Sequence, residues 1–297
     1  MFCKLCSSNA IFNRVLTCSS YSGIATHYLH SSSLPDLEAR LGELHFKDNA
    51  DKKERLQIIN STIEEFTTGL PHDQPIASPV SGNIRSAIDY IFTPGCTIDD
   101  VNKGFETILE DPVAPEDVKE WIKKTKATIE QRSPTSVRVA LQALQRGSRW
   151  SIAETFRREH AIAGKFMEHP DFVEGVSSLL IRKPRTTPQW QPSELSKVTD
   201  ADVNEFFDSP TLELLSSEDY REYPHAWIGL PKDRDVESFV NREGSVSKDQ
   251  ILEHFVRQTG GKLGVKEKIE EVLFRKTTVE ENGTVSWKRD NAVSDEE

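Results

Sequence analysis

The 297-residue sequence predicts a mainly α protein with a small α+β segment near its C-terminal end. Apolar residues recur at helical spacing between capping residues and helix breakers along most of the chain. One strong hairpin signal occurs in the sequence, Asn282-Gly283, and it lies between two short alternating runs. No apolar run approaches the ~18 residues that a membrane-spanning helix requires, so no membrane contact is expected.

The helices before residue 131 are predicted from a cap or a breaker together with one apolar stripe. After a short extended segment, Ser33 and Pro35 begin the first helix, and Thr97 caps a later one. Asp99 and Asp100 follow Thr97 in the first turn, where the helix dipole favours acids. Neighbouring helical residues do not face each other, so this pair is not expected to be catalytic. The predicted helices span 33–41, 51–66, 83–92, 98–109 and 115–130.

Residues 133–190 carry the clearest helix punctuation in the chain. Ser133 is an N-cap residue followed by Pro134, and Gly147 ends that helix. Ser151 and Glu154 are predicted to form a capping box for the next helix. Three apolar residues of this second helix are expected to turn inward: Phe156, Ala163 and Met167.

Two shorter helices are expected to follow. Asp171 is predicted to cap a helix over 171–180, and Thr199 to cap one that ends near Phe207. Asp208-Ser209-Pro210 is the most plausible domain boundary. Residues 216–246 are rich in turn formers and aromatic residues, and no helix is predicted there. The remaining elements are helices over 247–259 and 265–275 and a hairpin around Asn282-Gly283.

The net charge of −11 is distributed unevenly, with one basic island. Residues 133–192 contain 9 basic and 5 acidic side chains. An acidic chain with one such island does not resemble a general nucleic-acid binder. The island could serve a small anionic ligand or one acidic partner surface.

No metal site is expected. Cys3 and Cys6 form a CxxC without a second pair, and His27 and His30 lack a third ligand at a helical spacing.

The first twenty residues are rich in Ser, lightly basic and without an acid, as in a mitochondrial transit peptide. A mitochondrial location is therefore expected. A disordered terminus and a start assigned inside a longer gene are the alternatives. The domain organisation expected from the sequence is a presequence-like or disordered segment at 1–20, a helical region at 21–209 and an α+β extension at 210–297.

Four short motifs in order carry a family resemblance: GIATHYL (23–29), SPTS (133–136), DFVEGV (171–176) and the LLIRK and PQW segments of 179–190. Together they resemble the C-terminal part of the 3-hydroxyisobutyryl-CoA hydrolases, which belong to the crotonase superfamily. The resemblance implies an acyl-CoA substrate, thioester hydrolysis in mitochondrial valine breakdown and no cofactor beyond the CoA of the substrate.

In that family the strand spiral, the oxyanion segment and the catalytic carboxylates lie before the GIATH motif. About twenty residues precede Tyr21 here, so the chain is expected to form the helical C-terminal part of the fold without its β-spiral core. No catalytic residue is assigned. The resemblance implies a CoA contact by Leu179, Arg182 and Lys183. The alternative places Leu179 in the core and the two cations in solvent.

The extension at 210–297 resembles that of hydrolase relatives in the small subunit of fungal mitochondrial ribosomes. This gives two functional hypotheses, a hydrolase-like protein without its own active site and a non-enzymatic ribosomal component. A helical adaptor without a CoA link is a third. Expected partners are acyl-CoA if a core is supplied, mitochondrial ribosomal proteins, and a second copy, because several apolar stripes lack a partner surface.

Overall fold

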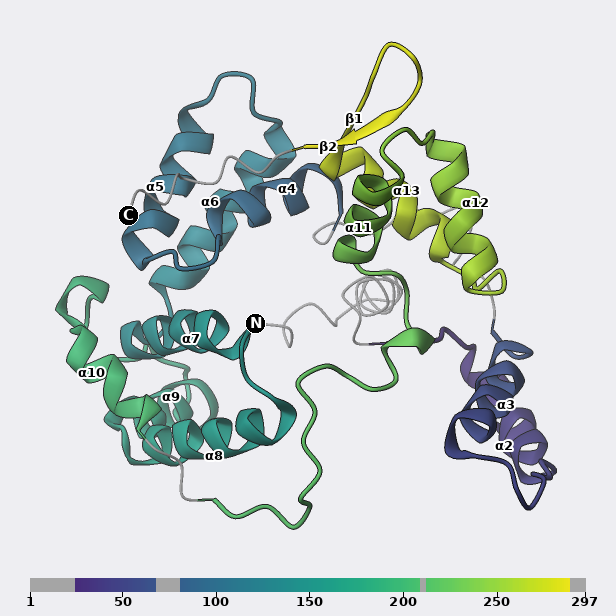
Figure 1. Ribbon diagram of the computed structural model, residues 1–297. Coiled ribbons are helices and arrows are strands. Elements are labelled where there is room, and N and C mark those ends of the chain that lie inside the picture. The colour runs from purple at the N-terminus through teal and green to yellow at the C-terminus, as the bar shows by residue number, and fades with distance from the viewer. Residues whose placement is uncertain (1–24, 68–80, 209–211, 289–297) are drawn as a thin grey trace. The chain divides into compact units, whose positions relative to one another are not determined.

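A computed structural model describes residues 25–67, 81–208 and 212–288 of the chain (Figure 1). These residues are mainly helical, as predicted, and they contain one two-stranded antiparallel sheet. The chain divides into two compact units, one formed by Met1–Ser86 with His225–Glu297 and the other by Ala87–Pro224. The domain boundary predicted at 209/210 stays a prediction, because residues 209–211 lie outside the described residues.

The helix bounds follow the predicted caps closely. Thr97 and Asp100 form a capping box, and Ser133 and Ser151 each accept an N–H from the third residue of their helix. Within the described ranges, no helix is long and apolar enough to cross a bilayer. The α-helices are α2 (Leu34–Gly42), α3 (Lys52–Glu64), α4 (Gly82–Ile91), α5 (Ile98–Glu110), α6 (Glu116–Glu130), α7 (Pro134–Gly147), α8 (Ile152–Glu168), α9 (Pro170–Val176), α10 (Asp200–Asn204), α11 (Asp233–Glu243), α12 (Lys248–Gln258) and α13 (Val265–Lys276).

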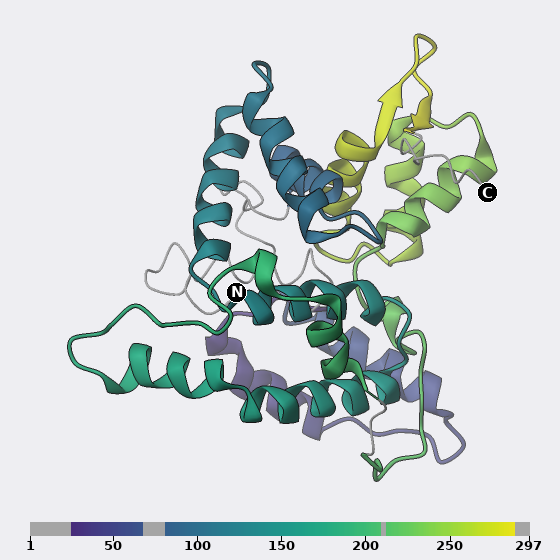
Figure 2. The ribbon, with the colours of Figure 1, turned by 90° about the vertical axis from the view of Figure 1, so that its left-hand side faces the viewer.

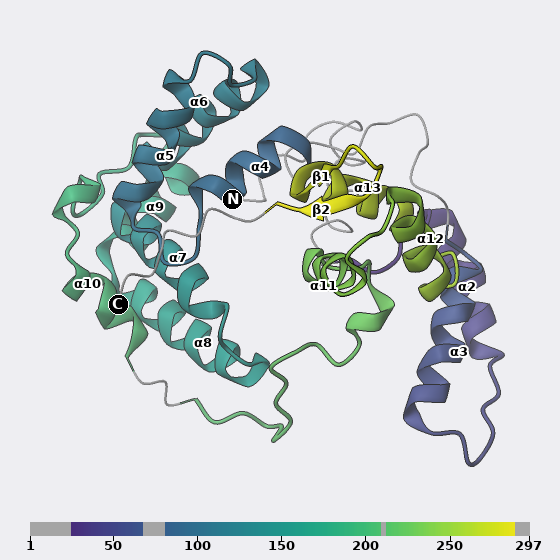
Figure 3. The ribbon, with the colours of Figure 1, turned by 45° about the horizontal axis from the view of Figure 1, so that its top comes forward.

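In the unit Ala87–Pro224, α7 and α8 pack with α10 and the 3-10 turn η5 (Glu205–Phe207) around one apolar core. Val139 and Ile162 are buried there, and the rings of Phe166 and Phe206 lie 4.6 Å apart. Helix α5 lies beside α6 (Figure 3). The core of this unit is thus formed by helices of the 133–191 segment together with residues 198–207.

The helices α11, α12 and α13 and the hairpin of β1 (Thr277–Val279) and β2 (Val285–Trp287) form a compact body, here called the C-terminal body. Its core includes Ile251, Ile269 and Val272, which are fully buried. The hairpin continues directly from the end of α13 (Figure 2). Gly283 has a φ of 78°, so the predicted Asn-Gly hairpin is confirmed.

Helix α3 is tied to the C-terminal body within the same unit. The Lys262 ammonium pairs with Glu64 of α3, and His27 Nε2 lies 3.0 Å from the same carboxylate. Burial and the nearby Lys262 charge lower the pKa of His27, although Glu64 acts in the opposite direction. The His27 ring is therefore neutral near pH 7, and its role is packing beside an ion pair.

Four sequence predictions are corrected by the structure. Only the Ser151 half of the capping box predicted at Ser151 and Glu154 forms, because the Glu154 carboxylate accepts from Arg158. Residues 216–246 contain the helix α11, which buries Val236 and Val240 one turn apart. Asp171 does not cap its helix, because His169 is the N-cap residue of α9. The buried face of α8 is formed by Ala153 and Ile162. The three α8 residues that were expected to turn inward are therefore exposed: Phe156, Ala163 and Met167.

A buried ion network joins α11 to α13 in the C-terminal body. The Asp233 carboxylate accepts from Lys268 Nζ at 3.0 Å and from Arg275 Nη2 at 2.5 Å. Arg275 Nε also donates to Glu271 Oε1 at 2.9 Å. The Arg275, Glu271 and Lys268 side chains are only 2%, 6% and 8% exposed, so water screens this network little.

The network predicts a pH dependence of stability. Burial by itself would raise the pKa of Asp233, but Lys268 and Arg275 outweigh burial and lower it from 3.8 to about 2. Because the folded-state pKa is depressed, the stabilisation is present above pH 3.8 and is lost as the pH falls toward 2. We expect the urea midpoint of the wild type to approach that of Asp233→Asn across this window. A constant difference between the two midpoints from pH 5 to pH 2 would contradict it.

Candidate functional site

Asp171, in the DFVEGV motif, is hydrogen-bonded to the SPTS motif and to Gln191, the residue that follows the PQW motif. Its carboxylate accepts the Ser133 Oγ–H at 2.5 Å and the Gln191 N–H at 2.7 Å. The Asp171 side chain is 4% exposed. The Ser133 hydroxyl also accepts the Ser136 N–H at the start of α7, so one oxygen both caps the helix and binds the carboxylate.

Glu174 of the DFVEGV motif holds the chain that leaves α9. Its two carboxylate oxygens accept from Arg182 at 3.0 and 2.9 Å, and one of them also accepts the Gln189 N–H at 2.9 Å. The Arg182 hydrogen bond and then the Gln189 N–H lower the pKa of Glu174. The glutamate therefore stays ionised near neutral pH, and it fixes both ends of the 182–189 segment.

Trp190 closes the same arrangement from the other side. Its Nε1–H donates to the Gln131 carbonyl at 3.1 Å. Its ring lies against Gly175, where an added Cβ would be 3.2 Å from the Trp190 Cη2 atom. The contacts of Asp171, Glu174 and Trp190, here called the motif network, thus tie the SPTS, DFVEGV and PQW segments into one body.

The residues implied as CoA contacts lie beside the motif network. Leu179 belongs to the π-helical turn η3 (Ser177–Ile181) and is 40% exposed, so it is not a core residue. Arg182 forms the two-point ion pair with Glu174, and Lys183 is exposed. All three residues are exposed, and their CoA contact stays a prediction.

An apolar groove of about 740 Å³ runs between α7 and α8. Its walls include Val139, Ile162 and Phe166, and Glu159 supplies its one carboxylate. Beyond this groove, α8, α9 and η3 leave large apolar side chains exposed: Ile152, Phe156, Met167, Phe172, Val173, Leu179, Leu180 and Ile181. Leu179, Leu180 and Ile181 are consecutive, and contiguous exposed apolar side chains are typical of a protein contact.

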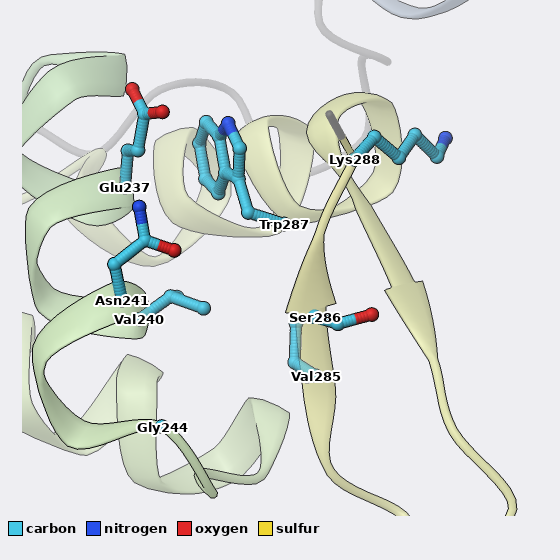
Figure 4. Close-up of a pocket in the computed structure, with 8 residues that line it drawn as sticks. All are labelled: Glu237, Val240, Asn241, Gly244, Val285, Ser286, Trp287 and Lys288. Atoms are coloured by element: carbon cyan, nitrogen blue, oxygen red, sulfur yellow. The ribbon is translucent and has the colours of Figure 1, made fainter. Parts of the chain in front are cut away.

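The C-terminal body has a second concave surface, of about 640 Å³, between α11 and β2. Figure 4 shows the Trp287 side chain directed toward α11, where Glu237 and Asn241 lie, and the Lys288 side chain directed away. Its charged groups do not converge on one point. Across the described residues, no group of three His, Cys, Asp or Glu side chains could hold a metal ion.

Sequence reasoning located the motifs but missed their mutual contacts. The hydrogen bond between Ser133 and Asp171 joins residues 38 positions apart. Asp171 also follows Pro170 in the first turn of α9, where an acidic residue already has a local explanation in the helix dipole.

The enoyl-CoA hydratase/isomerase family matches the sequence over residues 18–207, which is more than half of the chain. The chain belongs to this family, and the crotonase resemblance of its motifs is confirmed. The match ends at η5, so the C-terminal body lies outside it.

Individual relatives fall into two groups. The small ribosomal subunit protein mS47 of Neurospora crassa is 42% identical over 281 residues, covering 91% of this chain and 54% of that protein. The protein of the same name in Schizosaccharomyces pombe is 31% identical, covering 58% of this chain and 37% of its own length. The mitochondrial 3-hydroxyisobutyryl-CoA hydrolase of Mus musculus is 31% identical, covering 63% of this chain and 44% of that enzyme.

The matches to these relatives cover different shares of the chain. The chain spans about half the length, or less, of the curated relatives it matches. A match over 91% of the chain must continue well past residue 207, so the Neurospora crassa protein shares much of the extension. The mouse enzyme's name places it in the mitochondrion, which agrees with the location expected from the sequence.

Proposed function

We propose that the chain is a non-enzymatic component of the small subunit of the mitochondrial ribosome. The observation that carries the proposal is the extent of the match to mS47, which includes the C-terminal extension. The match to the mouse hydrolase covers 63% of the chain, about the span of the family match. A component of this kind needs a stable body and contact surfaces rather than a reaction centre.

The contacts of the motif residues support this proposal. Asp171 and Glu174 each accept hydrogen bonds from groups of the 133–191 segment itself, and Trp190 bonds to a backbone carbonyl. Polar groups engaged in this way stabilise a fold, because a buried acceptor that lost its donors would be costly. The exposed apolar side chains of α8 and α9 offer a surface for a neighbouring protein.

Sedimentation of the tagged full chain tests the proposal. In a mitochondrial extract of the organism that carries the gene, we expect the chain to migrate with the small subunit on a sucrose gradient. Splitting the ribosome at low Mg²⁺ should leave it with that subunit. A profile confined to the top of the gradient, beside soluble matrix enzymes, would contradict the proposal.

A second candidate is a hydrolase-like protein that supplies the helical part of a crotonase fold without catalytic residues of its own. The relatives named as hydrolases support it, and CoA would then contact Leu179, Arg182 and Lys183. We expect no CoA thiol release from 3-hydroxyisobutyryl-CoA above the buffer rate. Hydrogen exchange of residues 177–186 with and without CoA tests the contact, and protection would favour this candidate.

The exposed apolar side chains of α8, α9 and η3 are also where the predicted self-association would occur. Analytical ultracentrifugation of the purified chain over a hundredfold range of concentration tests it. An average mass that rises with concentration is expected if copies associate through this surface.

A further inference from the structure

A pocket of about 530 Å³ in the C-terminal body lies between residues 226–242 and α12. Its lining combines aromatic rings with cationic side chains. It lies outside the family match and has no part in the motif network. The pocket is here called the stacking pocket.

The aromatic groups of the stacking pocket are held in a fixed arrangement. The Phe239 and His254 rings are stacked with their centroids 4.0 Å apart and their planes at 23°. Phe255 lies edge-on to Phe239 at 5.7 Å and is buried beneath it. Trp227, in the 3-10 turn η6 (Ala226–Ile228), lines the same pocket and is 45% exposed. A large aromatic surface is thus presented to solvent beside a rigid stack.

Cationic side chains surround these rings. Lys232, Arg234 and Arg242 line the pocket against one carboxylate, Asp235, although the whole chain has a net charge of −11. Asp235 accepts the Lys232 backbone N–H at 2.8 Å, which directs it to the start of α11. The Arg242 guanidinium lies 5.5 Å from the Phe239 ring centroid. Its pair with Glu243 is on the surface, where such pairs are weak.

We infer that the stacking pocket binds a nucleotide of single-stranded RNA. A base would stack on the exposed Trp227 ring, and the adjoining phosphates would pair with Arg242 and Lys232. Aromatic platforms beside cations are how proteins bind unpaired nucleotides, whose bases expose a π-face that a duplex hides. The pocket volume lies within the range of about 300–1,000 Å³ typical of small-ligand sites. An acidic peptide would use the cations but not the rings.

The inference goes beyond the proposed function, because it assigns an RNA contact to residues outside the family match. It is tested on the purified full chain with a fluorescein-labelled ten-nucleotide oligouridylate, by anisotropy. Trp227→Ala is expected to weaken binding by about five- to 150-fold, the usual effect of losing one base–aromatic stack. Trp227→Phe retains a ring and should stay within a few-fold of the wild type.

Charge is tested with a matched pair of arginines. Arg242→Ala should weaken binding and reduce the slope of log affinity against log salt by about 0.7. Arg257→Ala changes an exposed arginine of α12 that does not line the pocket, and it should leave both unchanged. Hydrogen exchange of α11 and α12 verifies that each variant is folded. If Trp227→Ala is not folded, Trp227→Phe and Arg242→Ala carry the test.

Several results would overturn the inference. One is equal affinity of the wild type and the folded Trp227→Ala variant for the oligonucleotide. Another is that a duplex or poly-glutamate displaces the labelled oligonucleotide as well as an unlabelled single strand does. A third is that AMP binds as tightly as the oligonucleotide. The last result would assign the pocket to a free nucleotide. Wild-type sedimentation with the small subunit does not depend on these outcomes, so a failure here is distinguishable from a failure of the proposed function.

Discussion

Glu271→Ala is expected to destabilise the C-terminal body by about 3–5 kcal/mol, because it removes one partner of a buried ion pair. Arg275 is 2% exposed and donates to Glu271 from Nε at 2.9 Å. Without that carboxylate, a desolvated guanidinium would keep only part of its compensation, from Asp233. Hydrogen exchange of the α13 amides in the full chain measures the effect, as a loss of protection.

The chain contains a matched control for this prediction. Glu253 and Arg257 form the same i,i+4 pair on α12, but their side chains are 69% and 77% exposed. Glu253→Ala is expected to change stability by no more than about 0.5 kcal/mol. Similar losses in the two variants would mean that burial does not govern the strength of the pair, contrary to the prediction.

Asp171→Ala is expected to destabilise the unit Ala87–Pro224 by about 2–4 kcal/mol. It would leave the buried Ser133 hydroxyl without its acceptor, which costs about 1–3 kcal/mol, and it would also remove the part-buried bond from the Gln191 N–H. We expect hydrogen exchange to show opening at the start of α7, in α9 and near residue 191 together. Such a pattern distinguishes loss of the motif network from local fraying of α9.

Two further variants test how Asp171 acts. Asp200→Ala removes a carboxylate from the same unit whose side chain is 89% exposed, and it should cost less than about 1 kcal/mol. A double-mutant cycle of Asp171→Ala with Ser133→Ala should give a coupling of about 1 kcal/mol or more. Strict additivity of the two single changes would contradict a direct Ser133–Asp171 bond.

Local signals predicted most of the helices, because caps and breakers act within one or two turns. Thr97, Ser133 and Ser151 begin helices where the sequence places them. Helix α11 was missed because Lys232 precedes it, where Ser, Thr, Asp or Asn would signal a cap. Its remaining signal consists of acids in the first turn and two valines four positions apart.

The site was less predictable, because its contacts are long-range. The motifs identified the family. However, the distances between the motifs in the sequence do not indicate which of their residues are in contact in the fold. Arg182 also pairs with Glu174 eight positions before it, across the π-helical turn, a contact that the sequence did not predict. The stacking pocket is formed by two segments, near residues 227 and 254, and neither the composition nor the net charge of the chain predicts that they lie together.

The contact between Gly175 and Trp190 makes two distant positions a single steric unit. An alanine at 175 would place a methyl carbon 3.2 Å from the indole, closer than ordinary van der Waals separation. The indole Nε1–H also donates to the Gln131 carbonyl at 3.1 Å, so a shift of the ring away from position 175 would weaken that bond. The glycine and the tryptophan are therefore expected to be exchanged together during divergence, with larger residues at 175 tolerated only where a smaller side chain stands at 190.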